Sequence, residues 1–289
     1  MAHTPGTTGS ALQQYDQLTA RDRTLLDVLA EHRVLTTDQI TRLAFPSRDR
    51  AERRTLQLAR RNILARFRRM VRPGSQTWRY TLGHGGAAII AAQRGTEAPR
   101  PATQRARVLR LAENPHLDHL LGVNDFFVDL AHHARTHQGC GLLRWYSERR
   151  ATQACGQLAH PDGFATWQAD GHTISFFLEH DTGTEPLDRV AAKLAGYRDA
   201  ATGGGPQHPV LFWLPTAARE AHLRRALGAS PPVPVATATA ELARAHNANP
   251  ADALWLTATG SQRSRLAELP TPRSRTKEDI DHFIDNHAA

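Results

Sequence analysis

The chain has 289 residues, 40% of them hydrophobic, and its 36 Lys and Arg against 28 Asp and Glu give a net charge of +8 at pH 7. This length suggests one large domain or two ordinary ones. No apolar run approaches the length of a membrane span, and residues 1–17 show no signal sequence, so we expect a cytoplasmic protein without a membrane partner. Its two cysteines form neither a metal motif nor a disulfide framework.

The N-terminal elements predict a winged helix-turn-helix over residues 18–90. We expect residues 1–17 to be a disordered leader. The apolar positions that follow recur with helical period and predict three helices, at 18–33, 35–45 and 47–67. Residues 66–83 then predict two strands around Pro73-Gly74-Ser75. Three helices with a short second one, followed by a basic hairpin, are the layout of a winged helix-turn-helix.

The positive charge is concentrated in this part of the chain. Residues 42–79 contain twelve arginines and two acids, a net charge of +10, so the rest of the chain carries −2. Such clustering is typical of a nucleic-acid-binding module. A general preference for Arg over Lys is the alternative explanation, but it does not account for the clustering. We therefore expect duplex DNA as a partner, contacted by Arg48, Arg50, Arg53, Arg54, Arg60, Arg61, Arg68, Arg69 and Arg72.

A small, polar, proline-containing stretch at 91–107 is expected to be a linker. A second domain follows over 108–260, and a polar tail over 261–289. The domain reads as an α/β fold, a mixed sheet flanked by helices in which an antiparallel hairpin is joined to crossover units. Its predicted elements are a helix at 116–137, a strand at 141–148, a hairpin around Asp170-Gly171, a helix from Pro186 to about 201, a strand at 209–215, a helix at 216–227 and a strand at 253–258.

The turn Asp170-Gly171 fixes the register of that hairpin, because this dipeptide favours a two-residue loop. Paired positions then sum to 341, so Asp162 lies opposite Glu179, and His160 lies opposite Asp181. Side chains alternate between faces along a strand, so all four share one face. Opposed carboxylates repel each other, and such a cluster requires a cation, a proton or a basic side chain.

The order of these elements resembles the PD-(D/E)XK nuclease superfamily. Pro161-Asp162 matches the first motif of that superfamily, and Glu179, after the apolar stretch ISFFL, matches the second acidic position. Asp181 stands where the superfamily has a lysine. Some members carry the lysine on the following helix instead, where this chain has Lys193, with Tyr197 one turn further on.

Over residues 18–230 the chain more narrowly resembles the plasmid replication-relaxation proteins. The resemblance rests on the basic winged helix and on the strings HLDHLLGVNDFF, HPDG, FFLEHDTGTE and KLAGY. It implies a DNA-binding protein of a plasmid or integrative element, acting in replication, DNA relaxation or transfer. Beside DNA, the expected partners are other replication or transfer proteins, or a second copy of the chain in a homodimer.

The acids suggest a metal-dependent DNA nickase or endonuclease. The expected catalytic residues are Asp162, Glu179 and Lys193, the expected ligands of a Mg²⁺ or Mn²⁺ ion are Asp162, Glu179 and Asp181, and the expected supporting residues are His160 and Tyr197. Phosphodiester hydrolysis needs a hard cation held by carboxylates with open positions, and a lysine can orient the attacking water.

The alternative is a non-enzymatic DNA-binding regulator or replication accessory factor with a degenerate nuclease-like domain. Its acids would form ion pairs with Arg149, Arg150 or Arg189. Geometry separates the two hypotheses: convergence of the acids with Lys193 favours the enzyme, and an arginine filling the site favours the accessory factor. RNA binding is a third hypothesis, which the scarcity of basic motifs combined with aromatic residues does not favour.

Overall fold

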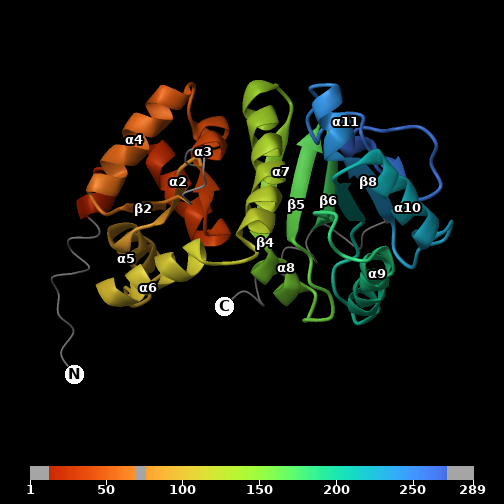
Figure 1. Cartoon of the computed structure of the whole chain (residues 1–289), viewed down its shortest axis with the longest axis horizontal. Helices are drawn as coiled ribbons and strands as arrows, with labels where there is room; N and C mark the ends of the chain where they lie inside the picture. Colours follow the sequence, from red (N-terminus) through yellow and green to blue (C-terminus); the bar gives the residue numbers. More distant parts are fainter. Residues whose placement is uncertain (1–12, 69–75, 272–289) are drawn as a thin grey trace. The chain divides into compact units, whose positions relative to one another are not determined.

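The computed structural model describes residues 13–68 and 76–271. The chain divides into two compact units, an N-terminal unit of residues 1–128 and a C-terminal unit of residues 129–289, with the boundary inside helix α7 (Leu117–Thr136). The mixed α/β class predicted from the sequence is confirmed (Figure 1). Among the described residues, no helix combines the length and the apolar character that a membrane span requires.

The N-terminal unit contains the predicted series of three helices followed by two strands. Its sheet is antiparallel, with the strand order β1-β3-β2. The elements are α2 (Ala20–His32), β1 (Leu35–Thr36), α3 (Thr37–Ala44), α4 (Arg48–Arg60), β2 (Leu64–Phe67), β3 (Arg79–Leu82), α5 (His84–Gln93) and α6 (Pro101–Ala112). Residues 13–16, which belong to the predicted leader, are helical. The rest of that leader, residues 1–12, and the predicted turn at Pro73-Gly74-Ser75 lie outside the described residues.

The first two helices begin where the sequence predicts. Thr19 and Asp22 form a capping box at the start of α2, and Thr36 and Gln39 form one at the start of α3. The third helix is shorter than predicted: α4 ends at Arg60, and residues 64–67 form β2 instead. Pairing of β2 with β3 satisfies backbone groups that would otherwise need helical partners, and it still buries the apolar side chain of Leu64.

The predicted linker at 91–107 differs from the structure, because α6 begins inside it. Pro101 occupies the first turn of α6, where its missing N–H is not needed. The side-chain amide of Gln104 donates a hydrogen bond of 2.8 Å to the carbonyl of Leu82 and so ties α6 to β3. The proline and small residues that suggested a linker therefore mark the start of a helix within the N-terminal unit.

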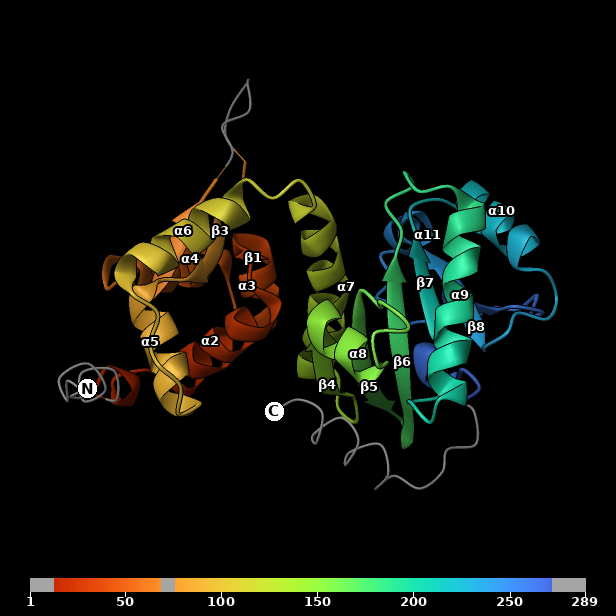
Figure 2. The same cartoon turned by 90° about the horizontal axis from the view of Figure 1, so that it is seen from below.

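The C-terminal unit is built on a mixed sheet of strand order β4-β5-β6-β7-β8-β9 (Figure 2). Strands β6, β7 and β8 run parallel to one another, and the remaining pairs are antiparallel. The elements are β4 (Gly141–Ser147), α8 (Glu148–Ala154), β5 (Gly163–Ala169), β6 (His172–His180), α9 (Leu187–Thr202), β7 (Val210–Leu214), α10 (Ala217–Leu227), β8 (Val235–Thr239), α11 (Ala240–Ala245), β9 (Leu256–Thr257) and the 3₁₀ turn η1 (Leu266–Glu268).

Helices α8, α9 and α10 share one hydrophobic core with the sheet. Their side chains Ala151, Leu194 and Leu223 belong to the same buried cluster as Phe177 of β6 and Phe212 of β7. Burial of this apolar surface is the main force that holds α9 on its face of the sheet. The functional residues predicted on α9 are positioned by that packing.

Part of the predicted polar tail belongs to the fold. Leu266 is completely buried, and the guanidinium of Arg263 lies 2.6 Å from the carboxylate of the buried Glu220. Residues 261–271 therefore pack within the C-terminal unit, because Leu266 is buried and Arg263 forms an ion pair with a buried carboxylate. Residues 272–289 of that tail lie outside the described residues.

The register of the β5–β6 hairpin is confirmed. The pairs run from Ala169 with His172 to Gly163 with Leu178, and each sums to 341. One residue beyond the last pair, the backbone N–H of Asp162 donates to the carbonyl of Leu178 at 3.0 Å. The Asp-Gly turn thus sets the position of Asp162 beside the end of β6.

Candidate functional site

Glu179 is the centre of the candidate site. It lies near the end of β6, which is an apolar strand, and only 3% of its surface is exposed. Its carboxylate accepts a hydrogen bond of 3.1 Å from Lys193 Nζ and one of 2.5 Å from the hydroxyl of Tyr197. Lys193 and Tyr197 are four residues apart on α9, so they share a helix face and both reach the acid. The structure therefore brings together three of the residues selected from the sequence.

Asp162 is the second acid of the site. Its Oδ2 accepts a hydrogen bond of 2.7 Å from the backbone N–H of His180, which fixes the carboxylate beside the end of β6. The negative charge of Asp162 raises the pKa of Glu179, so the two acids are electrostatic neighbours. His160, two residues earlier, is exposed.

The electrostatics of the site follow from burial. Loss of hydration raises the pKa of Glu179 to about 7, and the charge of Asp162 adds to this rise, whereas Lys193 and Tyr197 oppose it. Burial also raises the pKa of Tyr197, and the Glu179 charge raises it further. The site is therefore rich in acceptor oxygens and short of positive charge, despite the ammonium of Lys193.

Lys193 connects the buried acid to the surface. Its side chain is 39% exposed, and Nζ lies 3.1 Å from Glu179 and 3.1 Å from Glu185. Burial opposes protonation of Lys193, but the two carboxylates outweigh it and raise the pKa of the ammonium. Lys193 is thus a permanently charged group with one partner in the protein interior and one at its edge.

Asp181 does not join the other two acids. Arg219 of α10 holds it by two hydrogen bonds, one of them 3.0 Å from Nη2, and Nη2 also donates to the carbonyl of Glu185 at 2.5 Å. Nowhere in residues 13–68 and 76–271 do three His, Cys, Asp or Glu side chains form a group that could hold a metal ion. The three predicted ligands therefore do not form one group, because Arg219 holds Asp181, and the metal site stays a prediction. Arg219 lies on a separate helix, so no local pattern points to it, and it takes the role that was predicted for Arg149, Arg150 or Arg189.

The basic segment of the N-terminal unit has a second set of predicted residues. Arg61 is exposed just beyond the end of α4. Four arginines are exposed along the helix itself: Arg48, Arg50, Arg53 and Arg60. Arg48 forms ion pairs of 2.7 Å with Asp38 and Glu52, which partly neutralise it. The guanidiniums of Arg66, in β2, and Arg68, just beyond it, stack over Trp78 at 4.2 and 4.5 Å. Arg66 was not among the predicted residues, and Arg69 and Arg72 lie outside the described residues.

Some arginines of this segment are committed to the fold. Arg54 binds the buried carboxylate of Asp22 through two hydrogen bonds of 2.9 and 2.5 Å and so ties α4 to α2. Arg42 pairs with the half-exposed Asp125, and the buried Arg79 pairs with the exposed Asp118. Its buried partner gives Arg54 a structural role, and its contact with DNA stays a prediction. The surface available to a nucleic acid is therefore smaller than the charge of the segment suggests.

The comparisons with known proteins agree with the motifs. A family model described as replication-relaxation matches residues 26–211, a range that includes Asp162, Glu179 and Lys193. This confirms the resemblance found in the sequence. A search of the curated proteins and a search of the solved structures gave no match.

Proposed function

The chain belongs to the replication-relaxation family, and we propose that it binds duplex DNA through its N-terminal unit and hydrolyses a phosphodiester bond at Glu179 in its C-terminal unit. The family suggests a role in the replication or relaxation of a plasmid or other mobile element. The observation that carries the proposal is the meeting of Lys193 with Glu179, beside Asp162, at the end of a buried strand. Asp162 and Glu179 match the two acidic positions of the PD-(D/E)XK motif, and Lys193 lies on the helix that carries the lysine in some members, because Asp181 occupies the usual lysine position.

The DNA-binding part of the proposal rests on α4 and the β2–β3 hairpin. In a winged helix-turn-helix the third helix docks in the major groove and the hairpin contacts the phosphate backbone. Here α4 occupies the position of the third helix, and its exposed arginines supply phosphate contacts. The stacking of Arg66 and Arg68 on Trp78 orders two further guanidiniums at the base of the hairpin.

A Mg²⁺ ion fits the remaining donors. Magnesium is bound by one or two carboxylates and keeps several waters, and Asp162 and Glu179 are two such carboxylates. Burial and then the charge of Asp162 raise the pKa of Glu179, and a bound cation would offset both of these costs of its negative charge. When bound, the ion would supply Lewis-acid stabilisation of the phosphate charge.

The side chains of the chain itself have distinct tasks in this proposal. Tyr197 fixes one oxygen of Glu179, so the carboxylate is oriented before substrate binds. Lys193 reaches solvent, and its ammonium can turn from Glu185 to a phosphate oxygen and stabilise the charge that develops there. Water adds to phosphorus, the bond to the leaving sugar oxygen breaks, and the leaving oxygen takes up a proton. The products are a phosphate monoester and a hydroxyl group.

The second candidate is the accessory factor without cleavage. It is favoured by two contacts: Arg219 neutralises Asp181, and both oxygens of Glu179 already have donors. A site closed in this way would stabilise the domain and leave DNA binding as the sole activity.

A nicking assay on supercoiled plasmid separates the two candidates. We expect nicked circles with Mg²⁺ or Mn²⁺ and none with EDTA, together with a rise in melting temperature on adding the metal. Asp162→Asn should lose both effects, whereas Lys193→Met should lose cleavage and keep the thermal shift. Asp188→Asn, on the exposed side of α9, is the matched control and should behave as wild type. Intact plasmid and a melting temperature indifferent to both metals would establish the accessory factor.

The salt dependence of DNA affinity tests the N-terminal unit. Each phosphate contact contributes about 0.9 to the slope of log affinity against log salt concentration. Replacing Arg50 and Arg53 by Gln should therefore lower that slope by about 1.8. The same change at Arg225 and Arg244, which are exposed in the C-terminal unit, removes equal charge and should leave it unchanged. Equal slopes in both double variants would contradict docking through α4.

A further inference from the structure

The N-terminal unit contains a cavity that the proposed DNA and nuclease sites do not use. It has a volume of about 650 Å³ and lies among α2, β3, α5 and α6. Ligand pockets of proteins have volumes of about 300–1,000 Å³ and combine apolar walls with a few placed polar groups. Apolar side chains line much of this cavity, among them Leu29, Leu82, Ile90 and Val108.

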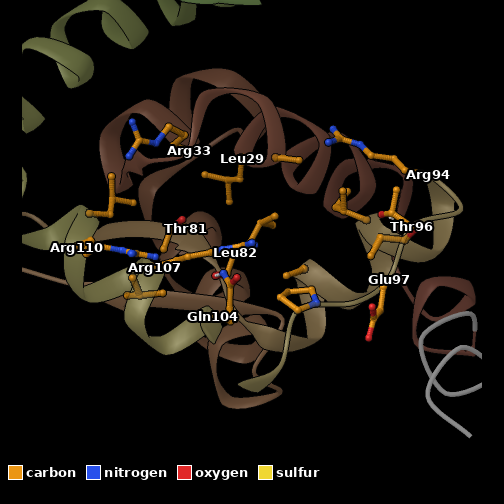
Figure 3. A pocket seen from close by; sticks show the side chains of 17 residues that line it. Leu29, Arg33, Thr81, Leu82, Arg94, Thr96, Glu97, Gln104, Arg107 and Arg110 are labelled. Carbon is orange, nitrogen blue, oxygen red and sulfur yellow. Dashed lines mark hydrogen bonds between the residues drawn. The ribbon is translucent and has the colours of Figure 1, made fainter. Parts of the chain in front are cut away.

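The two ends of the cavity differ in charge. Figure 3 shows Arg33, Arg107 and Arg110 at one end and Arg94 with Glu97 at the other, with Leu29 and Leu82 between them. Within residues 13–68 and 76–271, no carboxylate forms an ion pair with the first three arginines. Three exposed guanidiniums at the end of the cavity that lies away from Glu97 form an anion-binding end.

The backbone at Arg33 gives an independent sign of a binding site. Its φ of 72° and ψ of −44° are unfavourable for a residue with a Cβ, and the N–H of Val34 donates to the carbonyl of His32 at 2.8 Å across it. The buried side chain of Asn124 donates to the carbonyls of His32 and Val34, at 3.2 and 2.7 Å. The turn is therefore clamped from the core, which is typical of strain kept for function.

We propose that this cavity binds an organic phosphate of nucleotide size. The phosphate lies among Arg33, Arg107 and Arg110, because guanidiniums match phosphate oxygens with paired hydrogen bonds. The organic body lies against the apolar middle. Glu97 accepts a hydrogen bond from an amino or hydroxyl group at the far end, which favours a nucleoside over a fatty acyl chain.

A contact with the DNA backbone is the competing explanation for these arginines. It accounts for the positive charge, since exposed guanidiniums are the usual phosphate contacts. It accounts less well for a concave apolar wall, which a duplex backbone does not fill. The wall closes because Gln104 holds α6 on β3, so the cavity is a built feature and not a loose surface.

Calorimetric titration of the full-length chain with a nucleoside diphosphate tests the proposal. The titration is done in EDTA, so that metal binding near Glu179 does not contribute. We expect saturable binding that the neutral nucleoside, pyrophosphate and decanoate do not reproduce. Arg107→Gln with Arg110→Gln should weaken binding at least tenfold. Arg100→Gln with Arg105→Gln is the matched control, because both lie at α6 outside the cavity lining, and affinity should persist.

A second variant keeps the test independent of folding defects. Arg33→Gly removes one guanidinium and also relieves the backbone, so the free protein should melt at a higher temperature while its affinity for the nucleotide falls. The proposal is overturned by no binding of the diphosphate, by equal binding of pyrophosphate, or by equal loss in the control variant. It is also overturned if the Arg107 and Arg110 changes weaken only duplex DNA binding.

Discussion

Replacing Glu179 by Gln should change how the stability of the C-terminal unit depends on pH. Burial raises the pKa of Glu179 to about 7 in the folded chain, from an ordinary value of 4.5. The folded state therefore holds the proton more tightly than the unfolded state does. The resulting stabilisation is present at pH 4 and is lost as the pH rises through 7. The variant has no proton to lose at this position.

The structure gives the size of the effect. The interval between pKa values of 4.5 and about 7 corresponds to about 3 kcal/mol, at roughly 1.4 kcal/mol per pH unit. Between pH 4 and pH 8 the free energy of unfolding of the wild type should thus fall by about 3 kcal/mol relative to Glu179→Gln. The buried His208, whose pKa burial lowers to about 4, has the opposite pH dependence. It is present in both proteins, so it cancels in the difference.

Urea denaturation followed by tryptophan fluorescence at a series of pH values measures this difference. Glu185→Gln is the matched control, since it removes the other carboxylate on Lys193 but leaves the buried acid in place. Saturating Mg²⁺ should reduce the loss at pH 8, because the ion competes with the proton at Glu179; at a hundredfold excess over Kd its binding contributes about 2.7 kcal/mol. A difference that stays constant from pH 4 to pH 8 would refute the account of Glu179 as an acid destabilised by burial.

Three further predictions concern residues that support the two sites. Arg54→Met should lower the stability of the N-terminal unit by about 3 kcal/mol, because it leaves the charge of the buried Asp22 without its partner. The salt slope of DNA binding, measured where the variant is fully folded, should stay unchanged. Arg219→Met should likewise cost about 3 kcal/mol in urea denaturation, since it leaves the charge of Asp181 without its partner, and Asp181→Asn in the same chain should recover part of the loss. Gly196→Ala should lower both the melting temperature and the rate of any cleavage, because its Cβ would lie 2.2 Å from the carbonyl oxygen of Leu158 and displace α9. An unchanged melting temperature would contradict this close packing.

The hairpin and its acids could be derived from the sequence because the information is local. A two-residue turn fixes every pair of a hairpin, so one dipeptide determined that Asp162 lies beside the end of β6. Helical period then determined that Lys193 and Tyr197 share a face of α9. Short-range geometry of this kind depends on few residues, and each of these predictions needed only a turn or a repeat.

Contacts between distant elements could not be derived in the same way. The partner of Asp181 is Arg219, and the partner of Arg54 is Asp22, and in both pairs a separate helix carries the second residue. The same limit applies to the strand β8, whose sequence VATAT carries no strong strand pattern: it pairs with β7 and β9, and all five of its residues are buried. The burial of these residues depends on packing that no local pattern encodes.

The burial of Glu179 depends both on a local sequence pattern and on packing between distant elements. An apolar strand followed by an acid is a local pattern, but the closeness of that acid to Lys193 arises only when α9 packs on the sheet. The same packing removes water from the carboxylate and raises its pKa. In the proposed function, a cation that binds Asp162 and Glu179 must therefore displace a proton from Glu179. Metal affinity should accordingly rise with pH through 7, which links the stability of the fold to the state of its proposed catalytic centre.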